Sequence, residues 1–377
     1  MKKIGIITIT DYVNYGNRLQ NYASQEVLKS LGFDVETIVN VPKVEIEGGV
    51  QFTITRIKNA LKLSPIVLID KAIMKAKDKL SHGKYTACQK AKDKSFRVFT
   101  KQYINETDFV VSENNIPKNL GEQYDYFAVG SDQIWNPTLR KGSAFDFIQF
   151  APQNKRIALS PSFGVSSIPE KYTDIYTKWI SEMAFLSVRE QAGADIIKKL
   201  TGRESEVLVD PTLMLTKEQW LKIAHPAVKK PATKYLLTYF IGVVSAKRKK
   251  WLKDFATKHQ LEIVQMASLE DVERYDANPG EFTDYIRSAE IVCTDSFHAV
   301  IFSTLMQSPF VVFDREGRSA PMSSRIDTLL SKLKFEDRKF SSISASQNIF
   351  KIDFSHIPNI VELEQQKVLN YLKSALK

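Results

Sequence analysis

The fold is indicated most directly by three consecutive stretches, KIGIITIT (residues 3–10), LQNYASQEVLKSL (19–31) and FDVETIV (33–39). The first and third are short β-branched runs of the kind found in buried strands. The second has apolar residues at helical spacing and ends at Gly32. Together they predict a β-α-β unit. Parallel strands with crossover helices predict a doubly wound sheet, whose ligands lie beyond the carboxyl ends of the strands.

The same alternation returns along most of the chain. After the first unit, strands are predicted at 124–129, 156–160, 185–188 and 206–209, and helices at 171–182 and 191–200. A polar passage with two prolines at 225–231 precedes a second series, with strands at 235–241, 262–266, 291–294 and 310–313 and helices at 246–258, 282–289 and 297–306. We therefore predict an α/β protein with two Rossmann-type domains facing one cleft, at 1–225 and 226–360. A helical pattern at 361–377 can cross back onto the first domain.

Length and composition agree with this organisation. The chain has 377 residues, enough for two domains that each bury a core, and 43% of the residues are hydrophobic. Its cysteines, Cys88 and Cys293, lie far apart and away from any histidine at metal spacing, so we expect no zinc site, disulfide framework or cofactor. The apolar run that starts at Ile4 meets Asp11 too early for a signal peptide. We expect a cytoplasmic protein without a membrane span.

Positive charge is concentrated in one part of the chain. The stretch from Arg56 to Lys101 has thirteen Lys or Arg residues against three Asp, an excess equal to the net charge of the whole chain, +10. Amphipathic patterns at about 51–101 predict a helical excursion from the first domain. Such a strip can attract nucleic acid, anionic lipid or a phosphorylated substrate, or it can be a solvated helix face. Because no aromatic residues alternate with the charges as in a nucleic-acid platform, we expect no nucleic-acid partner.

The segment NYGNRLQN at 14–21 lies where the first strand should turn into the first helix. Backbone N–H groups at a helix N-terminus favour an anion, and Gly16 permits close approach. Asn14, Asn17 and Gln20 add donors and acceptors that suit sugar hydroxyls. Alternatively, Asn17 only caps the helix. The segment matches neither G-x-G-x-x-G nor a P-loop, so the nucleotide fingerprints are missing here.

A second polar segment, GSDQIWNP at 130–137, follows the predicted strand that ends at Val129. It offers the carboxylate of Asp132, the amides of Gln133 and Asn136, and the indole of Trp135. A sugar site needs such a set, since a ring face stacks on tryptophan and the hydroxyls require polar partners. The alternative is a turn in which Trp135 is buried in the core.

The third segment is TDSFHAVIF at 294–302. His298 falls in the first turn of a helix after a buried strand, so it should point into the interdomain cleft. A neutral imidazole there can accept a proton from a hydroxyl nucleophile. A lone histidine can equally be structural. A hydrolase pairing of Ser296 with His298 is disfavoured, because no G-x-S-x-G elbow exists and residues two apart at a helix start do not face each other.

Arginines that follow predicted strands form a fourth group, namely Arg189, Arg315, Arg318 and Arg325. The planar guanidinium binds carboxylate and phosphate in a bidentate manner, and positions after strands favour a place in the cleft. Single arginines are usually solvated or paired with a neighbour. Here the nearest candidates in sequence are Glu190 and Asp327.

Taken together, these segments resemble the polysaccharide pyruvyl transferase family. The matching pieces are YGNRLQNYA at 15–23, VGSDQIWNP at 129–137, SVRE at 187–190, VDPT at 209–212, GEF at 280–282 and DSFH at 295–298. They occur in family order over most of the chain, and SDQIWN at 131–136 is the specific block. The resemblance implies a GT-B-like fold with the site between two Rossmann-type domains, in agreement with the strand pattern.

The resemblance also implies a reaction, the transfer of an enolpyruvyl-derived unit from phosphoenolpyruvate to a sugar, commonly as a cyclic ketal on a capsular or other surface-polysaccharide precursor. By this resemblance, His298 matches the family's catalytic histidine and Arg189 matches its donor-binding arginine. Arg325 matches a later basic residue. The residues expected on the donor side are Arg189, Ser296, His298, Arg315, Arg318 and Arg325. Those expected on the acceptor side are Asn14, Asn17, Gln20, Asp132, Gln133, Trp135 and Asn136. Ala299 stands where many relatives have glycine.

The expected partners are phosphoenolpyruvate and a lipid-linked or soluble glycan acceptor. Because polysaccharide units are built on lipid pyrophosphates at the inner membrane face, the basic excursion is expected to hold the enzyme at an anionic membrane. Two alternatives stay open. One is a GT-B glycosyltransferase with a nucleotide-sugar donor, in which Glu281 binds the ribose. The other is a catalytically silent sugar-binding or scaffold protein.

Overall fold

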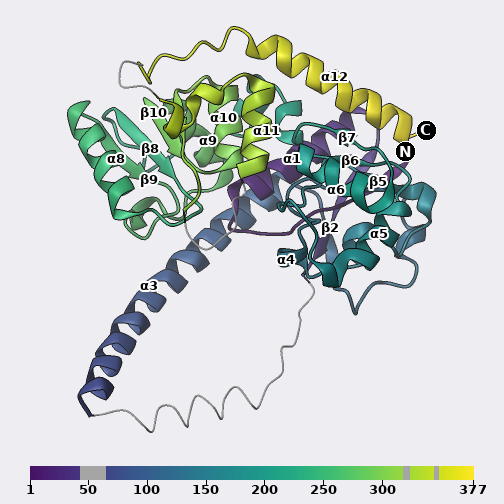
Figure 1. Cartoon of the computed structure of the whole chain (residues 1–377), viewed down its shortest axis with the longest axis horizontal. Helices are drawn as coiled ribbons and strands as arrows, with labels where there is room; N and C mark the ends of the chain where they lie inside the picture. Colours follow the sequence, from purple (N-terminus) through teal and green to yellow (C-terminus); the bar gives the residue numbers. More distant parts are fainter. Residues whose placement is uncertain (43–64, 317–322, 344–347) are drawn as a thin grey trace.

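The computed structural model describes residues 1–42, 65–316, 323–343 and 348–377, and at residues 65–82 and 323 it describes the backbone alone. The chain forms two α/β halves, each built on a parallel sheet, and the halves lie side by side (Figure 1). This arrangement confirms the predicted fold class, an α/β protein of the GT-B kind with two Rossmann-type halves and a helical excursion from the first.

The first half is built on a five-stranded parallel sheet in the order β3-β2-β1-β4-β5. Its strands are β1 (Lys3–Ile7), β2 (Asp34–Asn40), β3 (Glu106–Val111), β4 (Tyr126–Val129) and β5 (Arg156–Ala158). Helix α1 (Tyr15–Ser30) joins β1 to the parallel strand β2, which confirms the predicted β-α-β unit. A short parallel pair, β6 (Ser187–Val188) and β7 (Glu206–Val207), completes this half. Strand β3 was not predicted from the sequence.

The second half has a four-stranded parallel sheet in the order β11-β10-β8-β9. Its strands are β8 (Tyr235–Tyr239), β9 (Glu262–Gln265), β10 (Ile291–Thr294) and β11 (Phe310–Val312). The remaining helices are α4 (Pro137–Arg140), α5 (Thr173–Ser181), α6 (Gln191–Thr201), α7 (Lys217–Leu221), α8 (Ala246–Lys258), α9 (Pro279–Ser288), α10 (Phe297–Met306), α11 (Ser323–Leu333) and α12 (Ile357–Ala375). Helix α11 had no counterpart among the predicted elements, whereas the predicted strands and helices of both series are present.

Both sheets have a topological switch point, where the strand order reverses. In the first sheet it lies between β1 and β4, and in the second between β8 and β10. Ligands of doubly wound sheets bind outside the carboxyl ends of the strands at such points. The segments that start after β1, β4 and β10 carry the three polar motifs of the sequence. The fold therefore places these motifs where a ligand is expected.

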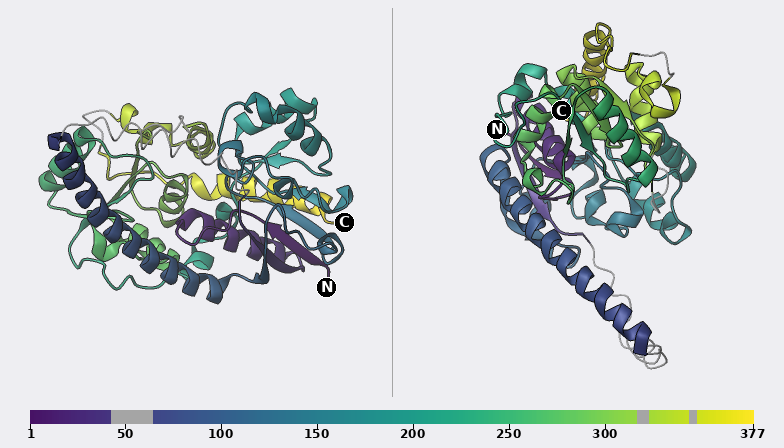
Figure 2. Two further views of the ribbon diagram at one scale, coloured as in Figure 1. Left: turned by 90° about the horizontal axis from the view of Figure 1, so that it is seen from below. Right: turned by 90° about the vertical axis from the view of Figure 1, so that its left-hand side faces the viewer.

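The long helix α3 (Pro65–Tyr103) extends away from the body of the protein (Figure 2). It confirms the helical excursion for residues 65–101, and the predicted part at 51–64 lies outside the described residues. Near its carboxyl end α3 contacts the second half, because Gln89 Nε2 donates to Tyr275 Oη at 2.9 Å and Lys84 Nζ donates to the carbonyl of Leu269 at 3.4 Å. The helix thus bridges the two halves.

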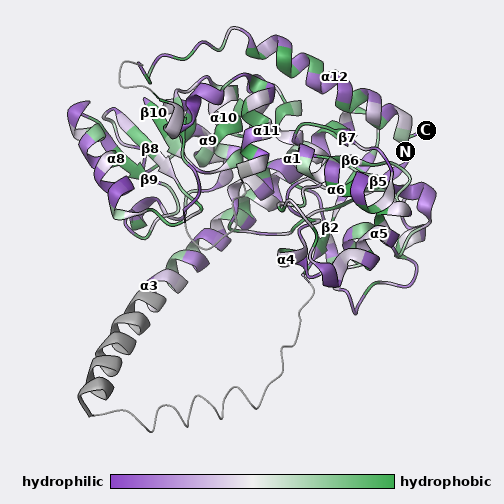
Figure 3. Ribbon diagram, in the orientation of Figure 1, coloured by the Kyte–Doolittle hydropathy of each residue, from purple (hydrophilic) through white to green (hydrophobic). Residues whose placement is uncertain are grey.

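Helix α12 returns from the second half to the first. Tyr371 Oη donates to the carbonyl of Ala158 at 2.6 Å, and Gln365 Nε2 donates to the carbonyl of Leu213 at 2.9 Å. Hydrophilic and hydrophobic residues both occur along α12 (Figure 3), as expected for a helix with one face on the protein. Among the residues with a described structure, no helix combines the length and apolar character needed to cross a bilayer.

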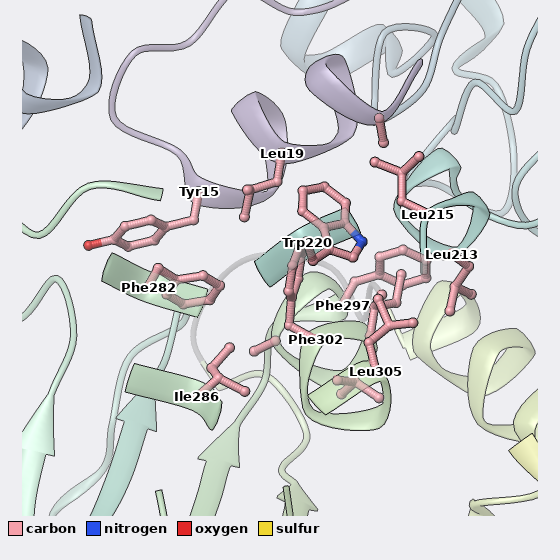
Figure 4. Packing of buried hydrophobic residues seen from close by; sticks show 14 of the residues in the cluster. Tyr15, Leu19, Leu213, Leu215, Trp220, Phe282, Ile286, Phe297, Phe302 and Leu305 are labelled. Atoms are coloured by element: carbon pink, nitrogen blue, oxygen red, sulfur yellow. The ribbon is translucent and has the colours of Figure 1, made fainter. Parts of the chain in front are cut away.

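One apolar cluster passes through both halves. Tyr15 at the start of α1 stacks on Phe282 of α9 with ring centroids 4.3 Å apart, and Trp220 meets Phe302 of α10 at 4.8 Å (Figure 4). Each half also has a cluster of its own. The shared cluster packs the two halves against each other. The predicted boundary at residues 225–226 stays a prediction.

Lys92 of α3 is buried within this contact between the halves. Its side chain is 4% exposed, and Nζ lies 4.3 Å from the ring centroid of Tyr15 and 5.7 Å from that of Tyr275. It forms no ion pair with a residue that the structure describes. Burial lowers the pKa of Lys92 to about 7, although Asp11 opposes this shift. Aromatic faces therefore supply the main described contacts of this cation.

Replacing Lys92 with Met should stabilise the protein at low pH. The unfolded chain binds the Lys92 proton up to its ordinary pKa of 10.5, but the folded chain binds it only up to about 7. The cost of burying the charge is therefore complete below pH 7 and fades as the pH rises toward 10.5. Contacts with the aromatic rings offset part of this burial cost. We therefore expect Lys92→Met to raise the free energy of unfolding by on the order of 2 kcal/mol at pH 6. Urea unfolding at pH 6 and pH 10 checks this, and an equal effect at both values would contradict it.

Candidate active site

The site forms where the first turn of α10 meets the loops that follow β1 and β4. Ser296 caps α10, with its Oγ accepting from the backbone N–H of Ala299 at 3.4 Å. The cap places His298 in the first turn, where its side chain is 7% exposed. Nε2 of His298 lies 3.5 Å from Oδ2 of Asp210, a residue of the first half. The imidazole therefore spans the contact between the halves.

Asp210 connects His298 with Arg189, which follows β6. Arg189 Nη1 donates to Asp210 Oδ2 at 2.7 Å, and Nη2 donates to Asp132 Oδ1 at 3.4 Å. The guanidinium also lies over the ring of Phe297, 4.4 Å from its centroid. Arg189 is thus paired with two distant aspartates and not with its sequence neighbour Glu190, whose Oε1 accepts from the backbone N–H of Phe163.

The charges in this cluster support one another. Burial by itself would raise the pKa of Asp210, but His298, Arg189 and the backbone N–H of Thr212 hold it well below its usual range. Burial likewise opposes ionisation of Asp132, yet the combined charges of Arg189, His298 and Arg325 lower its pKa. Both aspartates are therefore ionised at neutral pH and hold the cationic side chains in place.

Arg325 of α11 is the second buried arginine of the cluster. Burial, assisted by the like charge of Arg189, lowers the pKa of Arg325 to about 10. Its sequence neighbour Asp327 instead pairs with Lys339. The like charges of Arg189 and Arg325 repel each other in this buried place. An anionic ligand would relieve that repulsion.

Arg315 lies at the edge of the same region. Its Nη2 donates to the carbonyl of Asp295 at 3.4 Å, and Nε is 3.8 Å from Asp295 Oδ2. The Asp295 carboxylate also accepts from the backbone N–H groups of Ile241 and Gly242 at 2.7 and 2.9 Å. Asp295 therefore ties the loop after β8 to the segment that carries Arg315. Arg318 lies outside the described residues.

Gly16 allows the His298 ring to lie directly against the first turn of α1. A Cβ atom added to Gly16 would lie 1.9 Å from Nδ1 of His298, so only glycine lets α1 approach the imidazole this closely. From the sequence we expected this glycine to admit an anion, whereas in the structure it admits a side chain.

Replacing Gly16 with Ala should displace His298 and lower kcat by at least about tenfold, since small misplacements of a catalytic group are costly. Steady-state kinetics of the catalysed reaction measures the effect. Gly83→Ala is the matched control, because Gly83 also lies in a helix but a Cβ atom added to it would meet nothing within 4 Å. An unchanged kcat in Gly16→Ala would show that the contact is not needed.

Four of the expected acceptor residues are 0% exposed and bonded within the protein. Trp135 is 0% exposed, stacks on Phe147 at 5.0 Å, and donates through Nε1 to the carbonyl of Asp146. The expectation that its ring binds a sugar is wrong, because both its face and its N–H are occupied by the core. Its alternative, a buried core residue, is confirmed.

The buried amides serve structural contacts as well. Asn17 Oδ1 accepts from the backbone N–H of Asp11, Gln20 Oε1 accepts from that of Ser131, and the Asn136 side chain caps α4. Their expected contacts with sugar hydroxyls are wrong for this arrangement, since their polar atoms already have partners. Asn14 caps α1, a role the sequence had suggested for Asn17. Acceptor contacts by Asn14 and Gln133, which retain exposed surface, and by Asp132, which is 8% exposed and paired with Arg189, stay predictions.

Asp210 is the main site residue that sequence reasoning missed. It lies in the segment VDPT at 209–212, which matches the family but carries no predicted role. Its other oxygen, Oδ1, accepts from the backbone N–H and hydroxyl of Thr212 at 3.0 and 2.7 Å. An Asp-Pro pair after a strand was the available signal, because it fixes a carboxylate at a strand end.

Comparison with known families decides the classification. A family model described as polysaccharide pyruvyl transferase matches residues 14–317. The chain belongs to this family. All the residues of the cluster except Arg325 lie within the matched range, and the predicted resemblance is confirmed. Membership in the pyruvyl transferase family makes the protein a transferase of polysaccharide modification.

Solved structures with a similar chain course are distant from this pyruvyl transferase family member. A putative UDP-N-acetylglucosamine 2-epimerase from Listeria monocytogenes shares 8% identity over 97% of both chains, with a TM-score of 0.48. S. aureus MnaA, solved with UDP, shares 11% over 100% of this chain and 97% of that one, with a TM-score of 0.45. E. coli ADP-heptose LPS heptosyltransferase II shares 9% over 97% and 99%, with a TM-score of 0.36. No curated protein matches the sequence.

Proposed function

We propose that the protein transfers a pyruvyl group from phosphoenolpyruvate to a sugar of a surface-polysaccharide precursor and forms a cyclic ketal. The observation that carries the proposal is the buried pair of arginines, Arg189 and Arg325, with His298 beside them at the carboxyl ends of the strands. Phosphoenolpyruvate carries a carboxylate and a phosphate close together, which suits two neighbouring arginines. Membership in the pyruvyl transferase family supports the same donor.

In the proposed reaction, His298 takes the proton of an acceptor hydroxyl, and that oxygen bonds to C2 of the enolpyruvyl group while C3 gains a proton. A second hydroxyl of the same sugar then bonds to C2 and gives its proton to the phosphate, whose bond to C2 breaks, so that inorganic phosphate leaves. His298 returns the first proton to solvent, which supplies the proton gained by C3. Arg189 and Arg325 bind the donor anions and stabilise the departing phosphate. Asp210, whose Oδ2 lies 3.5 Å from Nε2, holds the imidazole in position on one side, and Gly16 admits it on the other.

The residue expected to bind the ribose in the nucleotide-sugar alternative is engaged in contacts within the protein. Glu281 was the expected ribose partner, but it closes a capping box on α9, with Oε2 accepting from the backbone N–H of Asn278 at 2.9 Å. Its Oε1 accepts from the backbone N–H of Val228 at 3.3 Å. Both oxygens are therefore occupied.

Phosphate release tests the proposed donor. The purified protein is incubated with phosphoenolpyruvate and a glycan acceptor, and inorganic phosphate is measured with and without acceptor. We expect acceptor-dependent release. Consumption of a nucleotide sugar, with no phosphate released from phosphoenolpyruvate, would instead establish the glycosyltransferase alternative. Unimpaired polysaccharide assembly in cells carrying His298→Ala would establish a scaffold.

We also propose that the protein works peripherally at the inner membrane face. Exposed lysines along the described part of α3, among them Lys84, Lys90, Lys94 and Lys101, offer positive charge for anionic headgroups. Lys92 does not contribute, since it is buried. Sedimentation with anionic and neutral vesicles tests the idea, and equal partitioning onto both at low salt would contradict it.

A further inference from the structure

A hollow on the flank of the first half is lined by the loop that precedes α5 and by residues of α5 and α6. These two helices, labelled in Figure 1, pack together. The volume of the hollow is about 290 Å³. This is close to the lower end of the range for small-molecule sites. Residues that carry polar or charged groups line it, namely Ser166, Ser167, Thr173, Asp195 and Lys199, together with the aliphatic residues Ile168, Ile196 and Leu200.

The charged groups of this hollow are available for a ligand. Asp195 and Lys199 lie one helical turn apart on α6, a spacing at which opposite charges usually pair. Neither forms an ion pair with a residue in the described ranges, and Asp195 accepts only the exposed amide of Gln191 at 2.9 Å. The adjacent Lys198, by contrast, pairs with Glu204. The hollow thus combines hydroxyls, a carboxylate and an ammonium group with aliphatic side chains.

Two segments that line the hollow, α6 and the loop before α5, lead directly to residues of the active site. Helix α6 begins at Gln191, directly after Arg189 and Glu190. At a rise of 1.5 Å per residue, Asp195 and Lys199 lie about 6 and 12 Å along the helix from Gln191, which is two residues after Arg189. The loop carrying Ser166 and Ser167 follows Gly164, whose backbone N–H donates to Glu190 Oε1 at 3.3 Å.

From this arrangement we infer that the hollow binds a sugar residue of the acceptor glycan, at some distance from the residue that receives the pyruvyl group. The inference rests on the proposed function. A sugar offers many hydroxyls to the polar groups and a C–H face to the aliphatic side chains. Charges of both signs suit a neutral polyol better than a simple anion. The distance to Arg189 is one that an oligosaccharide bridges and a monosaccharide does not, so the acceptor is an oligosaccharide.

Lys199→Ala, Asp195→Ala and Ser167→Trp test the inference, the last by filling the hollow. For an oligosaccharide acceptor we expect KM to rise about tenfold with kcat nearly unchanged, the effect of losing one charge-assisted hydrogen bond. For a monosaccharide acceptor both constants should stay the same. Lys198→Ala is the matched control, since Lys198 lies next to Lys199 but pairs with Glu204. Equal KM values for wild type and the three variants with the oligosaccharide would overturn the inference.

Glycan binding without phosphoenolpyruvate separates this inference from the proposed function. Saturation-transfer NMR with the oligosaccharide should show binding to wild type and Lys198→Ala, and at least about tenfold weaker binding to Ser167→Trp. This result would support the hollow even if phosphoenolpyruvate proved not to be the donor. Equal binding to all variants would reject the hollow even if pyruvyl transfer were established.

Discussion

Replacing His298 with Ala should lower kcat/KM for pyruvyl transfer by roughly 10²–10⁴-fold, the usual contribution of a general acid–base group. His298 is the imidazole at the contact between the halves, 3.5 Å from Asp210 and against Gly16. The aspartates of the described cluster are poor proton acceptors, because the neighbouring cations lower the pKa of Asp210 and Asp132 and make their carboxylates weak bases. Steady-state kinetics with phosphoenolpyruvate and acceptor measures the loss.

His259→Ala provides the control for this prediction. His259 lies at the end of α8, exposed to solvent and far in sequence from the site, so its loss should leave kcat/KM unchanged. Thermal unfolding of both variants separates loss of catalysis from loss of folding. A folded His298→Ala protein with near wild-type kcat/KM would contradict the proposed role of the imidazole.

Replacing Asp210 with Asn should reduce both stability and activity. The carboxylate is buried and shared by Arg189, His298, Ser131 and Thr212. Breaking a buried ion pair from one side leaves an uncompensated charge, so we expect the free energy of unfolding to fall by about 3 kcal/mol at pH 7. We expect kcat to fall as well, since His298 loses the group that orients it. Urea unfolding and kinetics measure the two effects.

The pH dependence of the Asp210→Asn effect has a defined sign. The folded pKa of Asp210 lies far below its ordinary value, so the stabilisation is complete above the unfolded pKa of about 4 and is lost as the pH falls below it. The difference between wild type and variant should therefore shrink below about pH 4. Asp276→Asn is the control, because Asp276 pairs with Lys229 at the surface and should cost at most about 1 kcal/mol. Equal losses in the two variants would contradict a special role for Asp210.

Local sequence pattern predicted the fold well where strands are apolar and helices are capped. The unit at 3–39 and the second series from 235 to 313 follow this rule, because buried parallel strands are nearly continuous apolar runs. Strand β3, ETDFVV, escaped prediction since it is an edge strand with a half-polar sequence and partly exposed side chains. Its place is set by pairing with β2, a tertiary contact that no local pattern contains.

The site was predicted in outline by the position of polar residues after strands. The positions after strands pointed to Arg189, His298 and Arg325 as neighbours, and the structure brings them together. Asp132 was expected on the opposite, acceptor side of the cleft, but it lies against Arg189, whose Nη2 donates to its Oδ1 at 3.4 Å. The prediction was wrong for Trp135 and the buried amides, because a residue type that suits a sugar also suits a core or a cap, and only burial distinguishes them. Gly16 and Asp210 matter because they contact His298, from which they are separated by nearly three hundred and by about ninety residues, respectively. Local sequence pattern does not contain contacts of this kind.

Mass spectrometry of the acceptor glycan tests the central claim most directly. A purified oligosaccharide acceptor is incubated with the protein and phosphoenolpyruvate, and the product is weighed and fragmented. Pyruvyl transfer predicts a mass increment of one pyruvyl ketal on a single sugar residue, with one inorganic phosphate released for each glycan modified and no product from His298→Ala. An unmodified glycan, or one extended by a sugar when a nucleotide sugar is supplied, would contradict the account.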